Sequence, residues 1–433
     1  MDHPLNDQAR SGSSTLSFSS RNFAPELRLF LGLCIALDVI TLIALPYYHF
    51  RYGDAARIQI WSLIDDRFGD FWHYRELFAY FHTQAFFTSA DRFAYPAPCA
   101  VVYQFLYHLG PRPHVVFSLM LFAALLASAW LFYRMLLRFN VRNAVASSLT
   151  VFLILTSYPW EKLFDRANIE LFVYLFLALG TWAYLTGRKS LAAAMWGCAG
   201  AMKIYPLVML ALFLHKKTLR PLLIGVLTFA AVLLASFWYV GPTIKAAAIG
   251  SIAGITGFIG NYAANAHLRE LTIDHSILGA TKEMLQLDTA HTGGWPYLST
   301  IYQAIVLVFG PILFFGWIRK LPALNQICLF LTAIVLLPPV SYDYTLVHIY
   351  LVIGIVVAAY LSAAQRGEQL QSSKSFAVIF ALLTSSEGWV QHGLLRINGV
   401  IKCVALLALC WLLMRIPLTL GLSAGKDETA EAA

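Results

Sequence analysis

The chain has 433 residues, of which 59% are hydrophobic and only 12% are charged, and its mean hydropathy is +0.66. Soluble domains carry about 25% charged residues, so this composition excludes an ordinary soluble enzyme and indicates a polytopic membrane protein. The formal net charge is +8, but the basic residues stand mainly in short loops between apolar runs. That placement is typical of loops on the cytoplasmic side of a membrane, so we expect no nucleic-acid partner.

Ten apolar runs approach the roughly 20 residues that a membrane-spanning helix needs. They lie at about 27–47, 114–136, 144–160, 169–186, 222–240, 297–317, 323–338, 345–364, 376–390 and 400–414. The polar, Arg-containing tail before the first run favours a cytoplasmic N-terminus. We expect the tails, 1–26 and 417–433, to be disordered and cytoplasmic, and residues 27–416 to form one transmembrane domain. Two larger loops, 47–113 and 241–296, then lie outside.

A further apolar run, LAAAMWGCAGAMKIYPLVMLALFLH, has basic residues on both sides, in GRKS and HKKTLR. A single span over about 190–215 would put one basic loop outside, whereas a re-entrant helical hairpin keeps both inside. Proline removes a backbone donor and favours a break near Lys203 and Pro206, and broken helices in membranes usually line a cavity. We favour the hairpin, and the single span is the alternative.

Acids, aromatics, histidine and proline gather between two apolar runs, in residues 65–103. Six short motifs follow from there in order: GDFWHY, FAYPAP, DRANIE, AGAMKIYP, HSILG and PPVSYDY. As an ordered set, over about 27–361, they resemble the GT-C-type glycosyltransferases that use a polyprenyl-phosphate sugar, specifically glycosyltransferase family 87. Named members of that family include the phosphatidylinositol-mannoside α-mannosyltransferases.

The resemblance implies an all-α polytopic membrane protein, a GT-C-like bundle of about ten spans plus the hairpin, with a catalytic acid on the first outside loop. Asp70 in GDFWHY matches the position of that acid. A carboxylate there would take the acceptor proton as an oxocarbenium-like transition state forms, with inversion at the sugar. The alternative is a solvated loop acid. Many GT-C enzymes carry a second acid two residues away, and this chain does not, so we expect no metal and no cofactor.

Tyr74 of GDFWHY is expected to shape the sugar pocket, unless it is a packing residue of the membrane interface. Arg166 and Glu170 of DRANIE are expected to face the cavity, whereas Asn168 is expected to cap the next helix. The family often has glycine where Ala167 stands.

Lys203 lies within an apolar run, where a cation is costly without a partner. It is expected to bind the donor phosphate or, alternatively, to pin the hairpin as a structural ion pair. His275 of HSILG and Asp343 of PPVSYDY complete the candidates for substrate binding. The family commonly has a histidine after that acid, where this chain has Tyr344, and His348 is a candidate to replace it.

We therefore expect a hexosyltransferase of the bacterial inner membrane whose site faces the periplasm. It would move a hexose, mannose by the resemblance, from a polyprenyl-phosphate donor to a lipid or glycan acceptor among the membrane lipids. A lipid or polysaccharide transporter or flippase is one alternative, although the sequence lacks the internal repeat that transporters usually show. A surface-polysaccharide polymerase or ligase that uses diphosphate-linked glycans is another.

Overall fold

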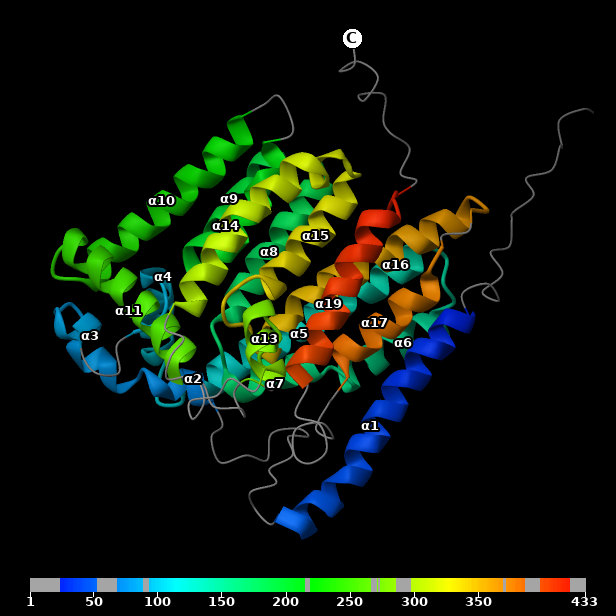
Figure 1. Ribbon diagram of the computed structural model, residues 1–433, viewed down its shortest axis with the longest axis horizontal. Coiled ribbons are helices and arrows are strands. Elements are labelled where there is room, and N and C mark those ends of the chain that lie inside the picture. Colours follow the sequence, from blue (N-terminus) through cyan, green and yellow to red (C-terminus); the bar gives the residue numbers. More distant parts are fainter. Residues whose placement is uncertain are drawn as a thin grey trace, which may run out of the picture.

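The computed structural model describes residues 24–52, 68–88, 93–214, 219–265, 271, 273–285, 297–368, 371–385 and 398–420. These residues are almost all helical (Figure 1), and the only extended pairing among them is a single bridge between Asp274 and Tyr342. The predicted all-α fold is confirmed. The outer parts of the two expected tails, 1–23 and 421–433, lie outside the described residues, as do 53–67 and 286–296 of the two expected loops.

Five helical stretches of the described chain are long and apolar enough to cross a membrane. They are α5 (Pro113–Arg138), α10 (Arg220–Val240), α14 (Leu298–Gly316) with η4 (Ile318–Lys320), η5 (Asp343–His348) with α16 (Ile349–Gln365), and α19 (Asn398–Arg415). Shorter apolar helices accompany them: α4 (Ala97–Tyr107), α6 (Asn143–Leu155), α8 (Glu170–Leu185), α15 (Ala323–Leu336), α17 (Ser373–Thr384) and the first part of α11 (Ile244–Asn265). With α1 (Ala24–Tyr52), a helix stands at each of the ten predicted spans.

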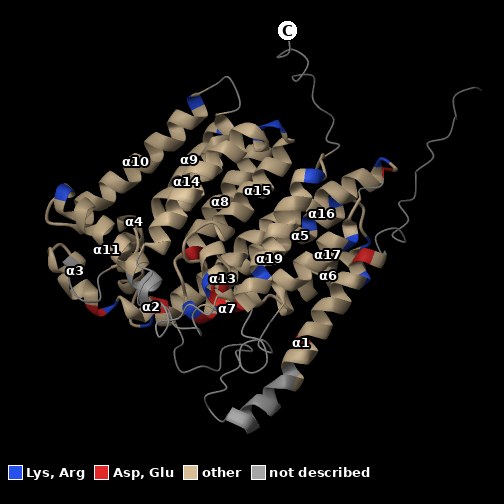
Figure 2. Cartoon of the chain, in the orientation of Figure 1, with Lys and Arg blue, Asp and Glu red and all other residues tan. Residues whose placement is uncertain are grey.

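The charged side chains confirm a multi-pass membrane protein. A broad band without charge crosses the middle of the bundle, and charged residues stand at the helix ends (Figure 2). Most Asp and Glu residues lie toward the lower edge of the figure, around α2 (Gly69–His73), α7 (Tyr158–Arg166) and α13 (Ile277–Met284), whereas the upper edge carries several Lys and Arg. Helices whose backbone polar groups are satisfied internally and whose middles are uncharged are the structures that lipid accommodates.

The predicted hairpin is formed by α9 (Lys189–Met202) and η3 (Tyr205–Phe213). Near the turn, a Cβ on Gly200 would lie 2.3 Å from Cδ2 of Leu207. Further away, the rings of Trp196 and Phe213 lie 5.7 Å apart between centroids. Later residues of η3 therefore lie beside earlier residues of α9, so the two arms are antiparallel and the chain does not continue as one span.

The two expected outside loops contain helices of their own. Residues 47–113 include α2, η2 (Glu76–Tyr80), α3 (Ala85–Thr88) and α4, and residues 241–296 include α11 and α13. α11 packs against α3 and α14, and Gly254 lets it approach the backbone of FAYPAP, since a Cβ there would lie 2.2 Å from the carbonyl oxygen of Phe93. At the other end, the packed bundle extends past 416, because Leu418 is buried and its N–H donates to Oδ1 of Asn325 (2.7 Å).

Candidate active site

Asp70 lies in the first turn of α2, a short helix that is fixed to α7. The chain enters α2 through Phe68, whose backbone is left-handed (φ 60°) and whose N–H donates to the carbonyl of Asp165 in α7 (2.7 Å). Behind Asp70, the buried ring of Phe71 packs on Tyr107 and Phe117, with centroids 4.9 and 5.6 Å away. These contacts fix where the carboxylate of Asp70 stands.

Both oxygens of Asp70 accept hydrogen bonds from the DRANIE segment. Arg166 donates to Oδ1 from Nη2 (2.6 Å) and Nε (3.1 Å), and Nδ2 of Asn168 donates to Oδ2 (2.6 Å). The Asp70 side chain is 14% exposed and that of Arg166 is 41% exposed. The carboxylate is therefore oriented by two donors and still reached by solvent.

Ala167 makes this arrangement possible. It ends α7 in the left-handed conformation (φ 45°, ψ 53°) and is fully buried. The reversal turns Arg166 and Asn168 toward the same carboxylate. A left-handed residue costs roughly 1–2 kcal/mol unless it is glycine, which gives a physical reason for a glycine at this position. Asn168 also accepts from the N–H of Glu170 through Oδ1 (2.9 Å), so it has the expected capping role as well as a role at Asp70 that sequence analysis missed.

Glu170 and Lys203 form a buried ion pair. Glu170 is fully buried, and its carboxylate accepts from the ammonium of Lys203, from the hydroxyl of Tyr205 (2.8 Å) and from Nε2 of His348 (2.6 Å). From sequence we expect Glu170 to face the cavity, but in the structure it does not line it. Lys203 and Tyr205 stand between Glu170 and the cavity. His348 is likewise buried, beside Glu170.

A cavity of about 430 Å³ lies between FAYPAP, the hairpin turn, α11, α14 and residues 337–345. One side of it is cationic and phenolic: Lys203 is 12% exposed, and its ammonium lies 5.4–5.8 Å from the ring centroids of Tyr95, Tyr205 and Tyr344. The other side is apolar, with Ile255, Phe258 and Ile259 from α11 and Val306 and Leu307 from α14.

Asp70 reaches this cavity through one intermediate residue. Nδ2 of Asn168, which binds Asp70, also donates to the hydroxyl of Tyr95 (2.9 Å), and Tyr95 and Tyr74 are both wall residues. Of the candidates from sequence, Tyr74 and Lys203 line the cavity, Asp70 and Arg166 adjoin it, and Glu170 lies behind it. Tyr95 and Tyr205 are wall residues that sequence analysis missed, although both stand in motifs it had singled out.

Asp343 and His275 lie behind the wall of the cavity. Asp343 Oδ1 pairs with Nζ of Lys402 (2.8 Å), and Oδ2 accepts from the hydroxyl of Tyr158 (3.0 Å). His275 Nδ1 stands 3.7 Å from Asp343 Oδ1. Burial lowers the pKa of His275 from its ordinary value, although Asp343 opposes the shift, so the imidazole is neutral at pH 7. Neither side chain lines the cavity, so any effect of these two on substrate passes through the residues beside them.

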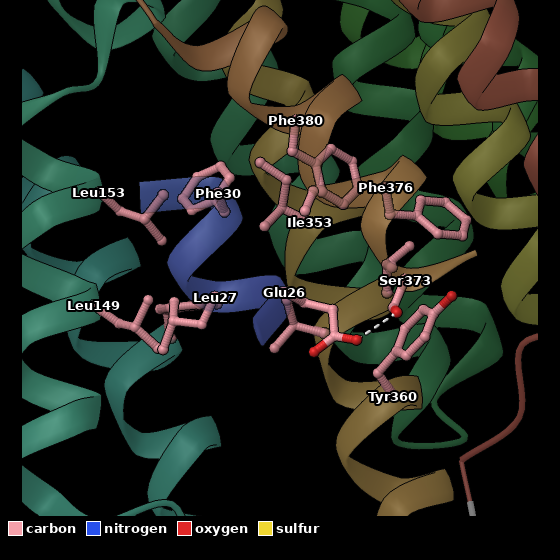
Figure 3. A pocket seen from close by; sticks show the side chains of 14 residues that line it. Glu26, Leu27, Phe30, Leu149, Leu153, Ile353, Tyr360, Ser373, Phe376 and Phe380 are labelled. Atoms are coloured by element: carbon pink, nitrogen blue, oxygen red, sulfur yellow. Dashed lines mark hydrogen bonds between the residues drawn. The ribbon is translucent and has the colours of Figure 1, made fainter. Parts of the chain in front are cut away.

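Among the residues that the structure describes, no group of three or more His, Cys, Asp or Glu side chains is arranged to hold a metal ion. Another, smaller pocket, of about 80 Å³, lies between α1, α6, α16 and α17 (Figure 3). Its lining is apolar apart from Glu26 and Ser373, which share a hydrogen bond of 2.9 Å, and Tyr360. It contains none of the candidate residues.

The family model of glycosyltransferase family 87 matches residues 93–339, more than half of the chain. The chain belongs to glycosyltransferase family 87. It is therefore a membrane glycosyltransferase, and the family predicted from the motifs is confirmed. No curated protein and no solved structure matches it. The matched residues of this family 87 enzyme include FAYPAP, DRANIE, AGAMKIYP and HSILG, and Asp70, Asp343 and Lys402 lie outside them.

Proposed function

We propose that this glycosyltransferase moves a hexose from a polyprenyl-phosphate donor to a lipid or glycan acceptor, with Asp70 as the general base and with inversion at the sugar. The observation that carries the proposal is the cavity itself. It has a lysine ammonium and phenols on one side and aliphatic helices on the other, and it adjoins a carboxylate that is already oriented.

The two sides of the cavity match the two ends of a lipid-linked sugar. A phosphate would stand near Lys203, where a charge-assisted hydrogen bond is stronger than a neutral one. Lys203 already pairs with Glu170 and Arg166 with Asp70, and the half-exposed guanidinium of Arg166 would add a second cation near the leaving phosphate. The apolar residues of α11 and α14 would cover the start of the prenyl chain, and tyrosine rings beside Lys203 would cover the sugar.

Asp70 is suited to take a proton because its two oxygens have different surroundings. Oδ1 is bound by Arg166 twice, whereas Oδ2 accepts from the amide of Asn168. The acceptor hydroxyl would approach Oδ2, lose its proton to the carboxylate and attack the anomeric carbon as the phosphate leaves. A single displacement inverts that carbon, so a β-linked donor would give an α-linked product.

We further propose that this site faces the periplasm of a bacterial inner membrane. The loops that precede α9 and follow α14, at GRKS and IRK, lie at the helix ends opposite Asp70 and α7, and basic loops favour the cytoplasmic side. Mannose is proposed from the family resemblance.

The experiment compares wild type, Asp70→Asn and Glu76→Gln in detergent, with radiolabelled polyprenyl-phosphate mannose or glucose and a lipid extract as acceptor. Glu76 is an exposed carboxylate of η2, close to Asp70 in the chain, so Glu76→Gln is a matched control. We expect label to move into product with wild type and control, and at least about a hundredfold less with Asp70→Asn, the lower end for loss of a general base.

Other outcomes separate the alternatives. A folded Asp70→Asn protein with the wild-type rate would remove Asp70 from catalysis. Transfer only from a diphosphate-linked glycan would indicate a polymerase or ligase, and movement of a lipid across vesicles without consumption of any donor would indicate a transporter.

A further inference from the structure

Lys402 is a fully buried lysine and the fifth residue of α19. Its ammonium lies 2.8 Å from Oδ1 of Asp343 and 4.5 Å from the ring centroid of Tyr158. A buried cation persists only when a partner compensates the cost of removing it from water. Asp343 is that partner, and it is itself 3% exposed.

The same carboxylate joins two further parts of the site. Its Oδ2 accepts from the hydroxyl of Tyr158, the first residue of α7. The last residue of α7 is Arg166, which donates hydrogen bonds to Asp70. Asp343 therefore connects α19, through Lys402, with the helix that orients the catalytic carboxylate.

Asp343 also fixes the cavity wall in which it stands. Its neighbours Ser341, Tyr342, Tyr344 and Thr345 all line the cavity, whereas Asp343 points to the rear. The rear of this wall has other fixed contacts. Nε2 of His275 lies 3.2 Å from the hydroxyl oxygens of Ser341 and Thr345.

We propose that Lys402 is a positioning residue of this enzyme: by neutralising Asp343 it holds the wall at 341–345 and α7 in the geometry that the reaction needs. The inference rests on the proposed transfer from a lipid-linked hexose. Without the ammonium, the buried carboxylate loses the cation that lies 2.8 Å from it, and it either takes up a proton or turns toward water. Both responses loosen its bond with Tyr158, and a misplacement of about 1 Å at a reacting group costs about a hundredfold in rate.

The test uses the full chain with Lys402→Met, Asp343→Asn and the double variant, and Lys374→Met as control. Lys374 is an exposed lysine of α17. Transfer rates are normalised to folded protein. We expect Lys402→Met to lower kcat at least tenfold with the donor KM within threefold of wild type, because Lys203 still faces the donor. The double variant carries no uncompensated buried charge, so its melting temperature and much of its kcat should recover.

The proposal is wrong if folded Lys402→Met keeps the wild-type kcat, which would make Lys402 purely structural. It is also wrong if the donor KM rises tenfold at unchanged kcat, which would make Lys402 a direct contact, or if the double variant is no more active than Lys402→Met. If Lys402→Met does not fold, the double variant decides. The proposal expects the double variant to be folded and active, and a folded but inactive double variant contradicts it.

A readout without catalysis separates this inference from the proposed function. Tyr342→Cys, in the cavity wall, is labelled by a thiol reagent with and without Lys402→Met, and Asp343→Asn is added to each. We expect Lys402→Met to change the labelling rate and the second substitution to restore it. If wild type transfers no hexose but this pattern appears, the proposed function fails and the positioning role stands. An unchanged labelling rate would overturn the positioning role even in an active enzyme.

Discussion

Replacing a carboxylate by an amide should affect different properties of the protein at Glu170 and at Asp70. Glu170→Gln and Asp70→Asn each replace one carboxylate oxygen by an amide nitrogen with almost no change in volume. Glu170 is fully buried and Asp70 is 14% exposed. We expect the first substitution to destabilise the fold and the second to abolish transfer while leaving the fold intact.

The expected loss of stability in Glu170→Gln follows from the partners of this carboxylate. Lys203, Tyr205 and His348 all point at this carboxylate, and only one oxygen of a glutamine accepts hydrogen bonds. The amide group would face a donor, and the Lys203 ammonium would lose its counter-charge. Removing one member of a buried ion pair costs about 3–5 kcal/mol, so the melting temperature of Glu170→Gln should fall clearly.

The small loss of stability expected for Asp70→Asn follows from the solvent exposure of the ion pair. Its ion-pair partner Arg166 is 41% exposed, so water compensates the loss of the pair, and exposed pairs contribute about 0–1 kcal/mol. Loss of a general base lowers the rate about 10²–10⁴-fold, which corresponds to about 3–5 kcal/mol of barrier.

The assay is thermal unfolding in detergent together with transfer from a polyprenyl-phosphate hexose, normalised to folded protein. Melting of Glu170→Gln at the wild-type temperature would refute the charged, buried pair. Destabilisation of Asp70→Asn by as much as Glu170→Gln would refute the use of exposure to separate a catalytic carboxylate from a structural one.

Two further predictions concern stability. Burial raises the pKa of Glu283 to about 8 from about 4.5 in the unfolded chain. Between these pH values the folded protein keeps a proton that the unfolded chain releases. The contribution of Glu283 to stability is therefore complete below pH 4.5 and is lost as the pH rises to 8. The melting temperature should therefore fall between pH 5 and pH 8, and less so in Glu283→Gln; an equal slope in the variant would assign the dependence to other groups. Gly197→Ala should lower the melting temperature, because a Cβ there would lie 2.4 Å from the carbonyl oxygen of Gly225 in α10 and overpacking costs about 1–3 kcal/mol. A Cβ on Gly354 in α16 meets nothing within 4 Å, so Gly354→Ala should leave the melting temperature unchanged or raise it. A lower melting temperature for Gly354→Ala than for Gly197→Ala would contradict the close approach of α9 to α10.

The positions of the helices and the hairpin were predictable from local sequence. In lipid an apolar run of about 20 residues satisfies its backbone only as a helix, so apolar runs and basic flanks locate the elements without knowledge of packing. The break at Lys203 and Pro206 was predictable for the same reason, because proline and two basic flanks act on their own segment. The motif around Asp70 also carried its information locally, through the order of short segments along the chain.

The partners of the charged side chains were decided by the tertiary structure. Glu170 was expected in the cavity, but His348, which is 178 positions away, and Lys203 enclose it. Lys402 stands in a predicted span, where a lone cation was a signal, yet its partner Asp343 comes from another helix 59 positions earlier. Whether a side chain faces the cavity or the rear of its wall depends on how helices rotate and pack against one another. That rotation follows from contacts between distant residues, so the sequence by itself indicated Asp70, Glu170, Lys203 and Asp343 as candidates, and only the fold showed their partners, Lys402 among them.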